Sequence, residues 1–191
     1  MKHTLNVLTL TALAAAASAQ TAPASGLNYN TITASRSQRD NSLAVQGVLG
    51  QSNFIVGLAT GTGDYSDTSY SQVGISYLFR NVTNGIDATV GVIQGNWEET
   101  VYTVQIRREL NEIYAGLELS AGYASTLQSD TTADFQFGGY GNDEAESSYY
   151  VGLTYNINKT FAVGVSLVKP TGYPYGTDYD RATVWSVRAS F

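Results

Sequence analysis

The carboxylates of this chain are the first candidates for chemistry, because the sequence has one histidine and no cysteine. Paired carboxylates can act as a general acid and base, or can bind calcium. The densest groups are Glu98 and Glu99, and the acidic run within residues 143–146. Neither group has the spacing of an EF-hand loop. We therefore interpret both as solvated acidic loops, and we predict no catalytic residue, no metal site and no cofactor.

The single histidine lies in a segment that we expect to be removed. A basic start at Lys2 and His3 precedes an apolar run over residues 5–17, and an Ala-x-Ala site ends at Ala19. These features are typical of a secretory signal peptide, so we predict cleavage after Ala19. The apolar run is shorter than the ~20 residues that a spanning helix needs, which argues against a membrane anchor.

Cleavage leaves a mature chain without histidine or cysteine. The whole chain carries sixteen acidic and ten basic residues, and the loss of Lys2 lowers its net charge of -6 by one. Histidine is the side chain that exchanges protons near neutral pH, so its absence argues against His-assisted hydrolysis. A transition-metal site is also disfavoured. The acidic balance offers no basic patch for phosphates, and we predict no nucleic-acid partner.

The elements that must position the charged residues are short alternating strands. Residues 149–167 show the pattern most clearly, because every second residue is apolar on both sides of a polar break at 156–160. This pattern is typical of an antiparallel hairpin with one apolar face. With Asn158 at the tip, the hairpin places Tyr155 opposite Phe161.

Two other connections are predicted to be tight turns. Asn84 and Gly85 are the residues of a type I′ hairpin turn, which sets Phe79 opposite Val90. A two-residue turn is expected at residues 111–112. In each of these hairpins the apolar residues of both strands share one face, which chance alone would not readily produce.

Ten such segments follow the signal peptide, and their connections alternate in length. Short turns fall near residues 51, 84, 111 and 158, and longer loops near 38, 65, 97, 135 and 175. A transmembrane barrel keeps its turns at one end and its loops at the other. We therefore predict an all-β fold, a ten-stranded antiparallel transmembrane β-barrel over residues 20–191. Eight strands is the alternative if the weakly alternating first strand, 27–35, and a neighbour are misassigned.

Aromatic residues lie at both ends of the apolar bands, where a barrel has its two membrane interfaces. Those toward the longer loops are Tyr102, Tyr123, Tyr149 and Trp185. Those toward the short turns are Phe54, Phe79, Tyr155, Phe161 and Phe191. The opposite face of the strands is mostly small or uncharged, which suits a barrel interior better than the outside of a soluble sandwich.

The signal peptide, the alternating strands and the last strand, with Trp185, Val187, Ala189 and Phe191, resemble small bacterial outer-membrane β-barrel proteins. The resemblance implies an outer-membrane location with lipid around the barrel. It also implies that the last strand, ending in Phe191, is the signal read by the barrel-assembly machinery during insertion. Enzymes with this fold rely on a catalytic histidine, so we expect no enzymatic activity. The resemblance is one of pattern, and indicates fold better than function.

Four charged residues fall on the interior face by alternation: Asp87, Arg107, Glu118 and Arg188. One interpretation is a constriction that selects ions. The other is a network of ion pairs that fills a narrow lumen, which we favour for ten strands because only much wider barrels leave a generous channel. In that case neutralising Glu118 affects stability more than conductance.

The longer loops carry most of the acidic residues and several tyrosines. Tyrosine beside glycine and aspartate is common at recognition surfaces, and the loop tyrosines are Tyr65, Tyr140, Tyr173, Tyr175 and Tyr179. The sequence thus favours a non-enzymatic surface barrel for surface interaction or envelope integrity, with an envelope protein or surface ligand as partner. A narrow channel for ions or small solutes and a secreted carbohydrate-binding β-sandwich are the alternatives.

Overall fold

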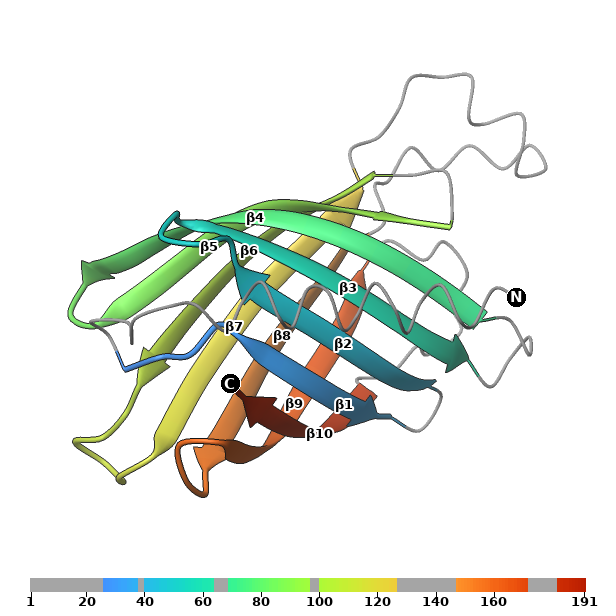
Figure 1. Cartoon of the computed structure of the whole chain (residues 1–191). Coiled ribbons are helices and arrows are strands. Elements are labelled where there is room, and N and C mark those ends of the chain that lie inside the picture. Colours follow the sequence, from blue (N-terminus) through green and yellow to red (C-terminus); the bar gives the residue numbers. More distant parts are fainter. Residues whose placement is uncertain (1–25, 38–39, 64–68, 97–99, 127–146, 172–181) are drawn as a thin grey trace.

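The computed structural model describes residues 26–37, 40–63, 69–96, 100–126, 147–171 and 182–191. Within these residues ten antiparallel strands close into a barrel, in which β1 pairs with both β2 and β10 (Figure 1). The strands are β1 (Thr31–Arg36), β2 (Asp40–Val48), β3 (Phe54–Gly63), β4 (Ser69–Thr83), β5 (Ile86–Gly95), β6 (Thr100–Glu109), β7 (Leu117–Thr126), β8 (Ser147–Asn156), β9 (Phe161–Thr171) and β10 (Ala182–Ser190). The predicted ten-stranded fold is confirmed. Among the described residues, no helix is long and apolar enough to cross a membrane.

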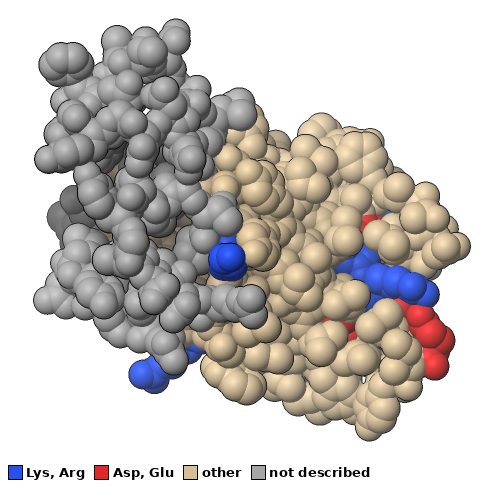
Figure 2. Space-filling model, turned by 180° about the vertical axis from the view of Figure 1, so that it is seen from behind, with Lys and Arg blue, Asp and Glu red and all other residues tan. Residues whose placement is uncertain are grey.

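Large apolar side chains cover the outside of the barrel. The aromatic residues predicted at the two interfaces are all exposed, from 38% for Phe191 to 64% for Trp185. Three of the outward rings touch: Tyr77 lies 5.2 Å from Phe54 and 4.9 Å from Phe79 between centroids. On the face in Figure 2, a wide uncharged belt separates charged side chains near the two ends. Such a belt is typical of a lipid-facing wall.

The β8–β9 hairpin has the predicted faces but a different register. Tyr155 pairs with Val163, not with Phe161. The side chain of Asn158 explains the shift, because its Oδ1 accepts hydrogen bonds from the backbone N–H groups of Thr160 and Phe161, both at 2.8 Å. The Phe161 carbonyl in turn accepts from the Ile157 N–H at 2.9 Å, which sets Phe161 opposite Ile157 at the base of the turn. The shift is two residues, so the apolar set stays on one face.

The turn between β4 and β5 is the predicted one. Asn84 and Gly85 both have positive φ, 47° and 74°, as a type I′ turn requires. Thr83 pairs with Ile86 directly beside them.

Beyond this turn a β-bulge moves the register by two residues. Phe79 pairs with Ala88 instead of the predicted Val90. Within the bulge Asn81 has φ 48°, and its backbone N–H donates to Asp87 Oδ1 at 2.8 Å. An interior carboxylate therefore shapes the bulge, which alternation alone does not reveal.

The connection between β6 and β7 is longer than the predicted two-residue turn. The last pair is Glu109 with Glu118, and residues 110–116 lie between the end of β6 and the start of β7. Gly116 has φ 84°, and its N–H donates to Asn111 Oδ1 at 2.9 Å. The loop therefore forms a compact hydrogen-bonded turn, and the shift again preserves the two faces.

The first predicted strand, residues 27–35, is wrong at its start. Strand β1 begins at Thr31, and residues 26–30 form an irregular segment inside the barrel. Leu27 and Tyr29 are 1% and 2% exposed. They pack in an apolar cluster whose other members are Val48, Ile55 and Leu78. Leu27 and Tyr29 are two positions apart and both are buried, so they give the same alternating pattern as a strand although they lie in an irregular segment.

The predicted loop residues lie outside the described residues. These are Tyr65, Tyr140, Tyr173, Tyr175, Tyr179 and the acidic groups at 98–99 and 143–146. The signal peptide, residues 1–19, also lies outside them.

Candidate functional site

Arg107, Glu118 and Arg188 meet inside the barrel, near the end with the short turns. Arg107 Nε and Arg188 Nη2 donate to opposite oxygens of Glu118, each at 2.8 Å. The side chains of Glu118 and Arg107 are 2% and 5% exposed, and that of Arg188 is 14% exposed. Arg188 Nη2 also donates to Asn156 Oδ1 at 2.9 Å. One buried carboxylate therefore holds two guanidinium groups from strands β6 and β10.

Asp87 is the fourth predicted interior charge, and it joins this group through a tyrosine. Asp87 and Arg107 are cross-strand partners on β5 and β6. The Tyr29 hydroxyl donates to Asp87 Oδ2 at 3.0 Å, and the Tyr29 ring lies over Arg107, with Cζ 4.5 Å from the centroid. Burial raises the pKa of Tyr29, so the phenol stays protonated as a donor.

The segment that carries Tyr29 contacts several strands of the barrel. The Asn28 carbonyl accepts from Arg107 Nη1 at 3.2 Å, and Asn30 Oδ1 accepts from the Val48 N–H at 2.9 Å. Gly26 lies so close to the Glu109 carboxylate that an added Cβ would stand 2.6 Å from its oxygen. Residues 26–30 thus complete the site from inside the lumen.

Arg80 is a further interior cation. Its Cζ lies 5.7 Å from the centroid of the Tyr29 ring. Within the described part of the chain, three buried guanidinium nitrogens have no hydrogen-bond partner: Arg80 Nη1, Arg107 Nη2 and Arg188 Nε. Buried donors without partners are costly, so this packing does not satisfy all of its polar groups.

Three cavities follow one another through the interior. The first, of about 330 Å³, shares Gln46, Gln105 and Tyr150 with the second, of about 190 Å³. The second shares Glu118 and Arg188 with the third, of about 340 Å³. The third is also lined by residues 26–28 and by turn residues. The ion-paired residues therefore stand between a polar inner cavity and the turn end of the barrel.

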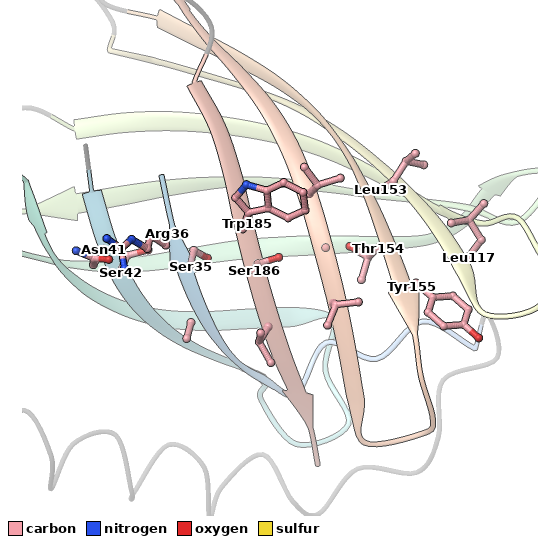
Figure 3. A pocket seen from close by; sticks show the side chains of 15 residues that line it. Ser35, Arg36, Asn41, Ser42, Leu117, Leu153, Thr154, Tyr155, Trp185 and Ser186 are labelled. Carbon is pink, nitrogen blue, oxygen red and sulfur yellow. The ribbon is translucent and has the colours of Figure 1, made fainter. Parts of the chain in front are cut away.

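The predicted assembly signal lies on the last strand, beside the closing pair β1–β10. Trp185 and Val187 are exposed on the outside, where they line an open apolar groove of about 770 Å³ with Leu153 and Tyr155 (Figure 3). Ala189 pairs with Ile32 of β1.

Comparison with known proteins adds evidence on the fold. No protein-family model and no curated protein sequence matches this chain. Two solved structures cover 84% of this chain and 98% of their own: the KdgM porin, with 11% identity and a TM-score of 0.50, and the NanC porin, with 12% identity and a TM-score of 0.51. The fold is that of a bacterial outer-membrane β-barrel protein. At this identity the likeness to these barrels concerns architecture alone.

Proposed function

We propose that this outer-membrane barrel is a narrow, non-enzymatic channel for small polar solutes. The series of interior cavities carries the proposal, because three cavities follow one another and the two that border the ion-paired site are lined largely by polar side chains. The two similar structures, both described as porins, support it. The uncharged outer belt supports a membrane location.

In this channel the constriction consists of Arg107, Glu118 and Arg188. Two positive charges surround one negative charge in a narrow, poorly hydrated place, where a charge acts on passing ions more strongly than it does in bulk water. The net positive charge of these three side chains favours anions over cations. The Glu118 carboxylate limits that preference, because it neutralises one of the two guanidinium groups.

The proposal includes export through a cleaved signal peptide, with the short turns in the periplasm as in other barrels of this kind. The test is to express the full chain in a Gram-negative host, separate the membranes, and sequence the N-terminus of the purified protein. We expect the protein in the outer-membrane fraction, beginning at Gln20. A chain recovered in the soluble periplasm would contradict this location.

The channel is tested by conductance of the folded, purified protein in planar lipid bilayers. We expect small steps, and a shift of the reversal potential toward anion selectivity in Glu118→Gln, because two arginines then lack a counter-charge. Glu112→Gln is the control, since Glu112 is an exposed acid in the loop after β6. Absence of steps from a protein shown to be folded would contradict the channel.

The second candidate is the surface barrel that the sequence favours, with loops for surface interaction or envelope integrity. The packed turn end of the lumen supports it, since Leu27, Tyr29 and Glu118 are each at most 2% exposed. A protein that is folded but silent in the bilayer, and whose loop-truncated variants lose binding to intact cells or envelope fractions, would favour this function.

A further inference from the structure

Residues 26–30 fill the turn end of the lumen without belonging to the wall. Pairing of β1 with β2 and with β10 begins at Thr31. Leu27, Tyr29 and Asn30 precede it and are still at most 4% exposed. Apart from the Asn30 carbonyl, which accepts from the Phe191 N–H at 3.1 Å, the segment lies outside the strand ladder, so it can leave the lumen without breaking the barrel.

The segment is held by contacts along one continuous stretch of the wall, from β2 to β6. Tyr29 contacts Asp87 and Arg107 on β5 and β6. Leu27 belongs to the apolar cluster, which draws on β2, β3 and β4. Tyr29 is the one side chain of the segment that contacts the buried charges through both its ring and its hydroxyl, so it is the strongest candidate for a latch.

The closed arrangement leaves polar groups unsatisfied. Arg80 and Arg107 lie against the Tyr29 ring, and each has a buried N–H without a partner. If the segment leaves, water can reach both guanidinium groups and satisfy these donors. Hydration of these donors offsets part of the free energy lost with the apolar contacts. The closed and open states of the lumen are therefore expected to be close in free energy.

We propose that residues 26–30 are a displaceable stopper that closes the turn end of the lumen, with Tyr29 as its latch. This inference rests on the proposed channel function, and it adds that the segment regulates whether the channel is open. Residues 26–28 of the stopper line the third cavity, next to Glu118 and Arg188 of the constriction. Departure of the stopper therefore widens the path between the inner cavities and the periplasm. Because the chain continues from Asn30 into β1, the displaced segment stays tethered to the barrel.

The position of the stopper is measured by thiol labelling, because the chain has no cysteine. Leu27→Cys places one thiol in the buried cluster, and Gln51→Cys places one at an exposed site in the turn between β2 and β3. A soluble maleimide should label Leu27→Cys at least tenfold more slowly than Gln51→Cys. Adding Tyr29→Ala should raise the Leu27→Cys rate tenfold or more, and Tyr29→Phe should raise it less, because the ring remains. Circular dichroism confirms folding of every variant.

Two labelling results would overturn the stopper. The first is a Leu27→Cys rate equal to that of Gln51→Cys, which means that the lumen is not closed. The second is a rate that neither Tyr29→Ala nor Tyr29→Phe changes, which means that the segment is a fixed part of the barrel.

Conductance of the same variants separates the stopper from the channel. Larger or longer openings in Tyr29→Ala than in the unchanged protein would support both proposals. Faster labelling without conductance in either protein would support the stopper and contradict the channel. If Tyr29→Ala does not fold, Tyr29→Phe replaces it in both measurements, with the same expected direction.

Discussion

The ring of Tyr29 lies over the guanidinium group of Arg107, with Cζ 4.5 Å from the ring centroid. The hydroxyl of the same tyrosine donates to Asp87, the cross-strand partner of Arg107. One side chain from the segment before β1 thus contacts a buried cation and a buried anion on neighbouring strands. Buried charges are costly unless they are paired and hydrogen-bonded. The segment and the interior charges therefore depend on each other for stability.

We predict that Tyr29→Phe lowers the free energy of unfolding by about 1–3 kcal/mol, because Asp87 loses a donor while the ring stays in place. Tyr29→Ala also removes the ring and should cost about 3–5 kcal/mol. Denaturant unfolding in detergent micelles measures both. Tyr102→Phe, at an outward position that is 43% exposed, is the control and should change little. Equal losses for the two Tyr29 variants would show that the ring does not contribute.

The alternation of the strands predicts the wall of the barrel better than its registers. A strand can slide by two residues without changing the face of any side chain, so apolar pattern alone leaves that freedom. Side chains of the turns decide the register here. Asn158 caps one hairpin, and Asp87 holds the bulge at Asn81. These are single hydrogen bonds that no periodicity records.

The interior charges illustrate a second limit. Alternation places Arg107, Glu118 and Arg188 on the same face, and the structure brings them into contact. Arg80 follows the outward Phe79 and could have been found by the same rule. Tyr29 could not, because its own alternation predicts a strand. A chain segment that folds back into a lumen is specified by distant contacts, which lie on five other strands.

We predict that Glu118→Gln lowers the free energy of unfolding by about 3–5 kcal/mol, because Arg107 and Arg188 remain buried without their counter-charge. Glu112→Gln is the matched control. Its carboxylate pairs with Arg108 at 2.6 Å, but the two side chains are 53% and 39% exposed, and such a surface pair contributes at most about 1 kcal/mol. Urea unfolding of both variants in the same detergent measures the difference. If both variants lose a similar free energy of unfolding, the buried ion pairs of Glu118 stabilise the protein no more than the exposed pair of Glu112 does.

The last strand provides the remaining prediction, which concerns assembly. We predict that Phe191→Ala lowers the yield of folded barrel in the outer membrane several-fold more than Phe161→Ala. Both side chains are exposed aromatics near the short turns, at 38% and 52%, so their loss of lipid contact should be similar. Only Phe191 belongs to the terminal pattern that resembles an assembly signal.

The yield is measured by membrane fractionation of cells that express each variant, and the stability of each purified, refolded protein is measured separately. A lower yield of Phe191→Ala at unchanged stability supports recognition by the assembly machinery. Equal yields would show that Phe191 acts as an ordinary interfacial aromatic residue. A fall in yield that follows stability in both variants would place the effect in the folded barrel instead, where Phe191 N–H donates at 3.1 Å to the carbonyl of Asn30, the last residue of the stopper.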